Sequence, residues 1–266
     1  MTGFNLGKVA ELSTVAIRVK DRDKMIDFYH DLIGFVLKGE ENALAIMGTV
    51  EDNSEKIWLE ESPRADDYFG ETKKLQSFSL YIPTITEIAA IYARLKKAEY
   101  SVKKISIDEK SVVILLVDPE ENQLEIYTEE PNSLVDEKAL LDQDSAEFPS
   151  LSKNVHIKKI QLNVDDVEAQ AAFLNDILGL EDNQGQFEIG EQTLEVNLTP
   201  SNSSVVQVDS DKILGLEILK FLISEESILA LESHLQNLKQ DFFIDKKKSI
   251  LTIYDAVGVE WWFVRK

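Results

Sequence analysis

Apolar and polar residues alternate over Val15–Val19, after which apolar residues recur three or four positions apart, as at Met25, Tyr29 and Ile33. Alternation is typical of a strand with one buried face, and the longer spacing is typical of an amphipathic helix. Gly34 follows the last of these apolar residues, and glycine commonly ends a helix. The pattern therefore predicts a strand followed by a helix near the start of the chain.

The same order of elements returns along the chain. IRVKDRDKMIDFYHDLIGF matches LNVDDVEAQAAFLNDILGL nearly position for position, and LQSFSLYIPTITEIAAIYARLKKAEY and GLEILKFLISEESILALESHLQNLK repeat the entry from strand to helix. Short strands are expected after the helices, at Phe35–Leu37, Ala43–Met47, Lys56–Glu60, Val102–Ile107, Ser111–Val117, Gln123–Tyr127, Phe242–Ile244, Ser249–Tyr254 and Glu260–Val264. An internal repeat of this kind predicts four βαβββ modules and an α+β fold.

The stretch at residues 131–153 is acidic, contains two prolines and has little periodicity, which is typical of a linker. We therefore predict a first domain at residues 1–130, an acidic linker at 131–153, and a second, more degenerate domain at 154–266, with two modules in each domain. Ala139–Leu141 within the linker is expected to form a short docking turn.

The chain has 28 Lys and Arg against 49 Asp and Glu, a net charge of −21. This charge repels phosphate backbones and anionic lipid surfaces, so neither nucleic acid nor a membrane is an expected partner. The absence of cysteine excludes thiol catalysis, disulfides and thiolate metal sites. No apolar stretch approaches the length of a membrane span and the N-terminus lacks a signal-peptide pattern, which predicts a cytoplasmic location.

The stretch LLVDPEENQLEIY, Leu115 to Tyr127, predicts a strand, a tight acidic turn and a second strand that carries Glu125 among alternating apolar residues. A carboxylate in the middle of a strand needs a physical reason. Glu125 is a candidate metal ligand, a candidate substrate contact, or a solvated side chain on the polar face of a sheet.

Four such modules with a strand–DPxxNxxE–strand motif resemble the vicinal oxygen chelate superfamily, which includes glyoxalase I, bleomycin-resistance proteins and extradiol dioxygenases. AIRVKDRDKMIDFYHDLIGF and VDPEENQLEIY carry the resemblance in the first half, and LNVDDVEAQAAFLNDILGL and YDAVGVEWWFV carry it in the second. The resemblance implies two glyoxalase-like, cup-shaped mixed sheets with helices on their outer faces.

More narrowly, the two-domain layout and the acidic, cysteine-free sequence resemble the CppA family, described as complement C3-degrading proteinases. This resemblance implies a hydrolase with a virulence role, complement C3 as partner, and a surface or secreted location reached by a non-classical route.

In the superfamily, paired modules hold a metal ion with residues at the start of each first strand and on each last strand. In the first half the two first-strand histidine positions fall on Thr14 and Ser77, and the last-strand glutamates fall on Glu60 and Glu125. In the second half the corresponding positions fall on Lys159, Ile218 and Trp262, with Glu260 two residues away. Zinc, iron and nickel favour imidazole, so we expect no metal ion and no cofactor.

The alternation also shows which side chains share a face with these positions. The predicted small-molecule site of the first half consists of Thr14, Arg18, Trp58, Glu60, Ser77, Ser79, Tyr81, Gln123, Glu125 and Tyr127. In this hypothesis Arg18 holds an anionic group and the aromatic rings stack on a flat ligand. The alternative is a solvated sheet face on which Arg18 pairs with a glutamate. The opposite face is apolar and is expected to pack under the helices, with Val15, Ile17, Val19, Phe78, Leu80, Ile82, Leu124 and Ile126.

A protease mechanism is not visible in the sequence, which lacks HExxH, GxSxG and Asp-Thr/Ser-Gly motifs. A serine triad is recognised by the geometry of its residues and not by their order in the chain, so the sequence does not forbid one. The candidate bases are His30, His156 and His234, and the catalytic residues stay unknown. The lysines at 246–248 are most simply a solvated hairpin tip.

Three functions therefore stay open: a proteinase that acts on complement C3, a metal-independent binder or enzyme of a small molecule, and a non-catalytic interaction scaffold. The substrate, the oligomeric state and the pairing of modules within or across the halves also stay open.

Overall fold

The structure is a computed structural model and describes residues 4–50, 53–66, 73–129, 136–144, 147–190, 194–200 and 212–266. The chain divides into two compact units, each assembled from separate segments. Unit 1 contains Met1–Arg18, Arg64–Gln76 and Lys159–Lys266, and unit 2 contains Val19–Pro63 and Ser77–Lys158. The units group segments in space, whereas the predicted boundary at 131–153 concerns their order along the chain and stays a prediction.

The predicted succession of strand, helix and further strands is confirmed. The first module consists of β1 (Glu11–Val19), α1 (Arg22–Asp27), the π-helix η2 (Phe28–Ile33), β2 (Val36–Glu41), β3 (Leu44–Gly48) and β4 (Glu55–Glu61). The second consists of β5 (Leu75–Tyr81), α2 (Ile85–Lys97), β6 (Val102–Ile107), β7 (Val112–Val117) and β8 (Gln123–Thr128).

The third module consists of β9 (His156–Val164), α4 (Val167–Ala172), the π-helix η3 (Phe173–Ile177), β10 (Gln186–Ile189) and β11 (Leu194–Pro200). Within the described residues this module has two strands after its helix, where three were predicted. The fourth consists of β12 (Gly215–Ile223), α5 (Glu225–Leu238), β13 (Phe243–Ile244), β14 (Ile250–Tyr254) and β15 (Glu260–Arg265). The short helices η1 (Leu6–Lys8) and α3 (Glu137–Leu141) lie outside the modules.

Each module helix begins at a side chain that accepts a hydrogen bond from the first turn. Asp21, Thr84, Asp166 and Ser224 occupy these positions, with oxygen–nitrogen distances of 3.0, 3.2, 2.9 and 3.1 Å. Such caps satisfy backbone N–H groups that have no partner within the helix. The first module's helix ends at Gly34, whose φ of 104° is the left-handed conformation that favours glycine, so the predicted stop is confirmed.

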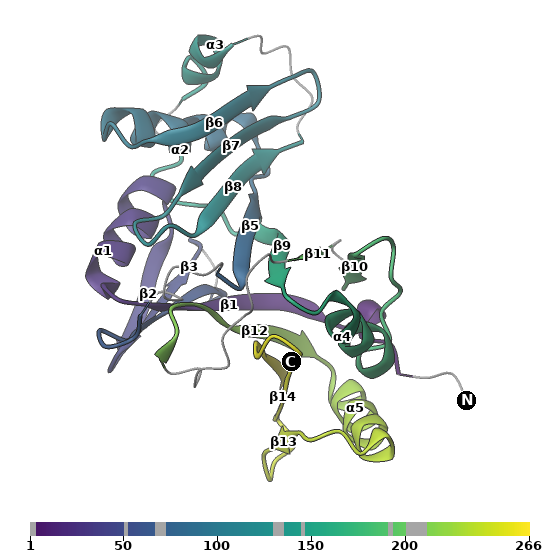
Figure 1. The fold of residues 1–266 in the computed structure, drawn as a ribbon. Helices are drawn as coiled ribbons and strands as arrows, with labels where there is room; N and C mark the ends of the chain where they lie inside the picture. Colours follow the sequence, from purple (N-terminus) through teal and green to yellow (C-terminus); the bar gives the residue numbers. More distant parts are fainter. Residues whose placement is uncertain are drawn as a thin grey trace. The chain divides into compact units, whose positions relative to one another are not determined.

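The predicted apolar face is buried as expected. Val15, Ile17, Val19, Phe78, Leu80, Ile82, Leu124 and Ile126 are all inaccessible to solvent. In unit 2, α2 covers one side of the sheet that includes β8 and buries Ile88, Ile91 and Leu95 (Figure 1). Burial of an apolar side chain of this size stabilises the fold by about 1.5–3 kcal/mol. This gain is the reason that apolar residues recur every three or four positions along α2.

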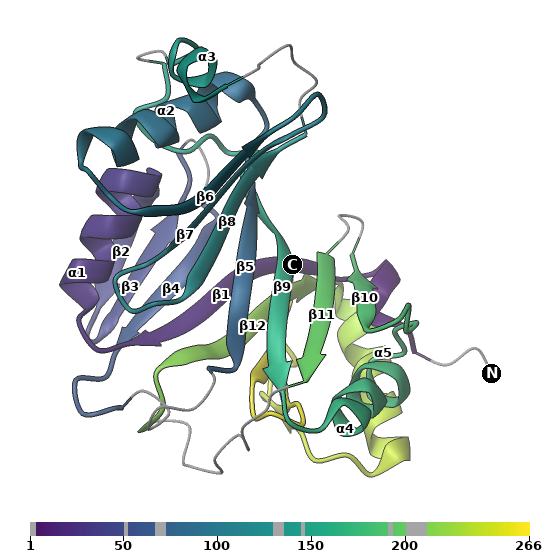
Figure 2. The ribbon, with the colours of Figure 1, turned by 45° about the horizontal axis from the view of Figure 1, so that its top comes forward.

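The module pairing that the sequence left open is visible inside unit 1. β1 lies antiparallel beside β12 (Figure 1), so the first strands of the first and fourth modules are neighbours. The strand order in this part of the sheet is β13–β14–β15–β12–β1. β9, β11 and β10 are also neighbours (Figure 2). The start of β5 lies beside β9, because the backbone N–H of Asn163 donates to the carbonyl of Lys74 at 2.8 Å. In unit 2 the strand orders are β4–β3–β2 and β5–β8–β7–β6.

The segment between the halves belongs to unit 2, where part of it packs onto α2. Ser152 donates to Glu87 on α2 through its backbone N–H at 2.6 Å and its hydroxyl at 3.0 Å. Arg94, also on α2, donates to the carbonyl of Phe148 at 2.9 Å. The expected docking turn is confirmed as α3, which buries Leu140. Among the described residues, no helix is both long and apolar enough to cross a membrane.

Candidate functional site

The acidic turn before Glu125 is fixed by the buried side chain of Asp118. Its Oδ1 accepts the backbone N–H groups of Glu120 and Asn122, both at 2.9 Å. Its Oδ2 accepts the side-chain amide of Asn122 at 2.8 Å and the hydroxyl of Tyr29 at 3.1 Å. Burial raises the pKa of Asp118, and burial together with the Asp118 carboxyl raises that of Tyr29. These hydrogen bonds fix the turn that leads into β8.

Glu125 lies opposite Ser79, because β5 and β8 are parallel neighbours. The Ser79 hydroxyl donates to Glu125 Oε1 at 2.8 Å. On its other side, Glu125 lies opposite Leu115 of β7. The carboxylate in the middle of this strand therefore has a hydrogen-bond partner within its own sheet.

Two further pairs flank Ser79 and Glu125 on the same face. Tyr81 lies opposite Tyr127, with ring centroids 5.7 Å apart in an edge-to-face arrangement, and His156 lies 5.1 Å from Tyr81. Ser77 lies opposite Gln123 on the other side. We call the surface formed by Ser77, Ser79, Tyr81, Gln123, Glu125 and Tyr127 the β5–β8 face. It brings these members of the predicted site together.

The other predicted site residues lie on two different strands. Trp58 and Glu60 share β4 in unit 2, where the indole N–H of Trp58 donates to Glu55 at 3.1 Å. Thr14 and Arg18 share β1 in unit 1. Thr14 lies opposite Lys220 of β12. The hydroxyl of the neighbouring Ser13 donates a hydrogen bond to the backbone carbonyl of Lys220 at 3.1 Å.

Thr14 lies on a face of the unit 1 sheet that is formed by two rows of side chains, which we call the β12–β15 face. Its first row runs across neighbouring strands through Thr14, Lys220, Trp262, Thr252 and Phe243. Its second row runs through Ala16, Ile218, Glu260 and Tyr254. The sequence assigned Ile218 and Trp262 to old metal positions of the second half, with Glu260 two residues away, but local patterns could not bring them beside Thr14. Only the strand pairing does so.

Arg18 forms an ion pair with Glu217 of β12, and only 5% of the Arg18 side chain is exposed. The solvated-face alternative also expected a glutamate partner for Arg18, but in solvent, whereas this ion pair is largely buried. Lys74 is also buried in unit 1 and donates to the carbonyl of Gly258 at 3.2 Å. Burial lowers the pKa of Lys74, against the opposing effects of Asp255 and Glu217. Unit 1 therefore holds a buried group of opposite charges next to β1 and β12.

The residues at the old metal positions do not fit a transition metal. Thr14 and Ser77 offer hydroxyl groups where imidazole is needed, and the Ser79 hydroxyl already binds one oxygen of Glu125. Lys220 and Trp262 occupy the row of Thr14 and offer no lone pair to a metal ion at neutral pH. In the part of the chain that the structure describes, no three His, Asp or Glu side chains converge to hold a metal ion.

The three histidines have separate surroundings. His30 contacts Asp31 at 2.6 Å on an exposed surface. His156 contacts the carbonyl of Asn154 at 2.9 Å, and burial lowers its pKa. His234 stacks on Phe4 at a centroid distance of 5.7 Å. Across the described ranges, none of the three is hydrogen-bonded to a serine or threonine hydroxyl.

A cavity of about 480 Å³ lies in unit 1, away from both sheet faces. Its lining includes Asn5, Leu180, Glu181, Asp182 and Glu188. No residue of the predicted site reaches it, so we base no function on it.

Comparison with known proteins identifies the family. The family model CppA N-terminal matches residues 12–137, and CppA C-terminal matches residues 151–263. No curated protein sequence matches the chain.

Solved structures give the fold. The cppA protein from Streptococcus pneumoniae TIGR4 is 21% identical with a TM-score of 0.70, over 98% of this chain and 100% of that one. A putative dioxygenase from Bacillus subtilis subsp. subtilis str. 168 is 14% identical with a TM-score of 0.63, over 97% and 86%. Glyoxalase I from Zea mays is 14% identical with a TM-score of 0.59, over 96% and 92%. Likeness at these identities concerns the fold alone. With both CppA models matched in order, this protein belongs to the CppA family and has the fold of the vicinal oxygen chelate superfamily.

Proposed function

We propose that this protein acts on complement C3, the partner that the resemblance to the CppA family implies, and that it does so without a metal ion. The observation that supports metal independence is the hydrogen bond from Ser79 to Glu125 at 2.8 Å, together with a hydroxyl at Ser77 where the superfamily has a histidine. A site with these donors favours direct contacts with a partner over Lewis-acid chemistry.

Recognition of C3 is the first step of this function, and cleavage is the second. In the described residues no histidine is hydrogen-bonded to a serine or threonine hydroxyl, so the cleavage step has no support from a serine triad. The step therefore needs its own experiment, separate from binding.

The test is incubation of purified C3 with purified protein, with and without a chelator, followed by mass spectrometry of the fragments. Binding is measured in parallel by surface plasmon resonance. We expect C3 binding that is unchanged by the chelator. If cleavage occurs and is lost in the triple variant His30→Ala, His156→Ala, His234→Ala, a histidine-dependent proteinase is established. Cleavage that survives in this variant indicates a contaminant or another site, and the absence of both binding and cleavage contradicts the proposal.

A second function, binding of a small organic molecule, is favoured by the β5–β8 face. There a hydroxyl–carboxylate pair lies between two tyrosine rings and an amide, which is the mixture of polar and aromatic groups typical of ligand sites. A ligand that raises the melting temperature of the protein, and has no effect on Glu125→Gln or Tyr127→Ala, is the expected result. Glu109→Gln, in an exposed turn of the same unit, is the matched control. A stable oligomer with neither activity favours the scaffold function instead.

A further inference from the structure

The turn between β13 and β14 carries three consecutive lysines in a chain whose net charge is −21. Lys248 pairs with Glu232 on α5 at 2.6 Å. Lys246 and Lys247 are exposed, and in the described part of the chain neither forms an ion pair. Two ammonium groups are therefore available to a partner at one end of the sheet.

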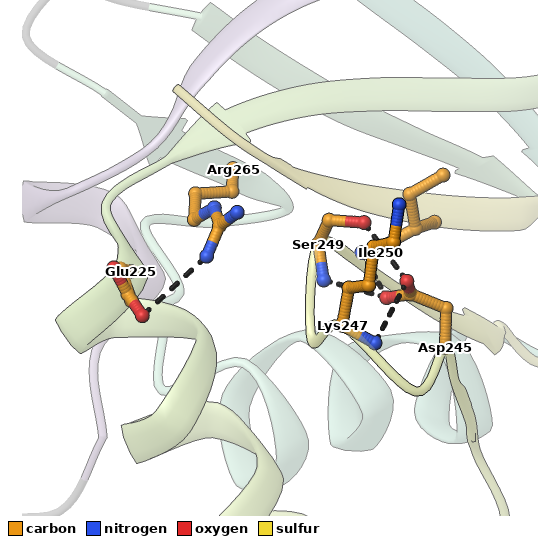
Figure 3. A network of polar contacts seen from close by, with 6 residues as sticks. All are labelled: Glu225, Asp245, Lys247, Ser249, Ile250 and Arg265. Atoms are coloured by element: carbon orange, nitrogen blue, oxygen red, sulfur yellow. Dashed lines mark hydrogen bonds and ion pairs between the residues drawn. The ribbon is translucent and has the colours of Figure 1, made fainter.

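This turn is held in one conformation by Asp245 (Figure 3). The carboxylate accepts the backbone N–H groups of Lys247 at 3.2 Å, Ser249 at 2.5 Å and Ile250 at 2.8 Å. It also accepts the Ser249 hydroxyl at 2.9 Å. A turn fixed in this way presents its lysines with little further loss of backbone entropy on binding.

Two exposed aromatic side chains lie on the sheet that carries this turn. Phe243 is the one next to the turn, whereas Tyr254 is at the far end of β14 and is hydrogen-bonded to Glu260. Phe243 on β13 is 62% exposed and Tyr254 on β14 is 55% exposed. Phe243 lies opposite Thr252, two residues before Tyr254, so both rings are on the β12–β15 face. β13 is also the edge strand of its sheet. The Phe243 ring beside an open strand edge offers apolar area to an extended partner segment.

The equivalent turn of the second module shows that the fold does not require these lysines. Between β6 and β7, Asp108 accepts the backbone N–H groups of Lys110 and Ser111 at 2.8 and 2.9 Å, as Asp245 does in the fourth module. The tip of that turn is Glu109–Lys110, which has no net charge. Of these two turns, the one in the fourth module carries a strongly basic tip and the one in the second module does not.

We propose that Phe243, Lys246 and Lys247 form a docking surface for a short acidic segment of a partner protein. Carboxylates of the segment pair with the two lysines, and an apolar side chain packs on Phe243. The segment is short because acidic residues elsewhere on the surface repel any part of a longer polyanion that comes within about 10 Å of them. Lysine on an edge strand also prevents pairing between sheets, but that role gives no reason for an exposed Phe243. The proposal goes beyond the action on C3 and does not depend on it.

The test uses a fluorescein-labelled ten-residue peptide of alternating glutamate and phenylalanine, with binding followed by fluorescence anisotropy. We expect Lys246→Glu with Lys247→Glu to weaken binding about tenfold or more, and Phe243→Ser to weaken it about fivefold. The matched control is Lys103→Glu with Lys104→Glu, which makes the same charge change at two exposed residues on β6, and it should change binding less than about twofold. Circular dichroism verifies that each variant is folded.

Several results overturn the proposal. Failure of the unmodified protein to bind the peptide removes its basis, and equal weakening by the β6 control reduces it to an effect of net charge. Tighter, lysine-dependent binding of oligo-dT or of phosphatidylserine vesicles assigns the surface to another class of partner. Self-association in sedimentation velocity that is lost with Lys246→Glu and Lys247→Glu assigns it to a second copy of the chain.

Discussion

The second and fourth modules close with turns that differ in sequence and agree in their contacts. Asp118 and Asp255 are both buried, and each accepts the backbone N–H groups two and four residues further on. The other carboxylate oxygen accepts a hydrogen bond from a helix of the preceding module, donated by Tyr29 at 3.1 Å and by Gln170 at 2.9 Å. The hydrogen bonds of this turn are therefore retained although the donor is a phenol in one module and an amide in the other.

The inner faces of the same two modules do not agree. Ser79 and Glu125 form a hydrogen-bonded pair in the second module, whereas Lys220 and Trp262 lie opposite each other at the same places in the fourth. The turn determines where a side chain lies, and leaves its chemistry free to change. Each face therefore needs a function of its own, and variants in both modules can test this separation.

The largest loss of stability is expected on truncating the buried residue that precedes Trp262 in the fourth module or Glu125 in the second. Trp261 is fully buried, stacks on Phe221 at 5.1 Å and donates to Asp255 at 3.1 Å, whereas its counterpart in the second module is Leu124. We expect Trp261→Ala to lower the free energy of unfolding by about 4 kcal/mol and Leu124→Ala by about 3 kcal/mol. Urea denaturation measures both. The control is Trp262→Ala, at a half-buried position. If Trp261→Ala lowered the free energy of unfolding less than this control does, Trp261 would not be the core counterpart of Leu124.

The next effect concerns the two turn carboxylates. Asp255→Ala leaves the buried side-chain donors of Gln170 and Trp261 without a partner, and we expect it to cost about 3 kcal/mol. Asp118→Ala should cost about 2 kcal/mol, because one of its donors is on the half-exposed Glu120 and can bind water. Asp31→Ala, at an exposed position, is the control and should be neutral. A neutral Asp118→Ala would contradict the shared role of the turns.

The same carboxylates give the stability a pH dependence. Burial raises both pKa values in the folded state above the ordinary 3.8. Their contribution is therefore complete below pH 3.8 and decreases as the pH rises through the folded pKa values. Urea denaturation of Asp118→Asn and Asp255→Asn at a series of pH values should show a weaker decrease over this window than the unmodified protein. An unchanged pH profile in both variants would contradict the assignment.

The order of elements and their buried faces could be predicted because burial leaves a local period in the sequence. Gly34, the alternation at Val15–Val19 and the β5–β8 face all depend on residues within one module. The position of Thr14 opposite Lys220 depends on which first strands pair, and any of the four could pair with another by local pattern alone. For the same reason the sequence predicts a tight acidic turn before β8, but not that Tyr29 reaches Asp118 from another module.

A smaller effect is expected on the β5–β8 face. Ser79→Ala removes one hydrogen bond to the half-exposed Glu125 and should cost about 0.5–1 kcal/mol. Ser106→Ala, at a half-exposed serine of β6, is the control and should be neutral within about 0.5 kcal/mol. A double-mutant cycle of Ser79→Ala with Glu125→Gln isolates the pair. A coupling energy of zero would mean that the face is a set of independent side chains, and would weaken its case as a ligand site.

The smallest effect separates the two hairpin turns. Backbone hydrogen bonds, from Ile250 above all, lower the pKa of Asp245 to about 2, and bonds from Lys110 and Ser111 lower that of Asp108. A lowered pKa means that the contribution to stability is present above pH 3.8 and is lost as the pH falls through the folded value. The amide resonance of Ser249 should therefore titrate with a midpoint near 2 in an NMR pH series, and Asp245→Asn should abolish that titration. A midpoint near 3.8 would mean that the lysine turn is not held by its aspartate, and that its basic tip differs from the β6–β7 turn in conformation as well as in charge.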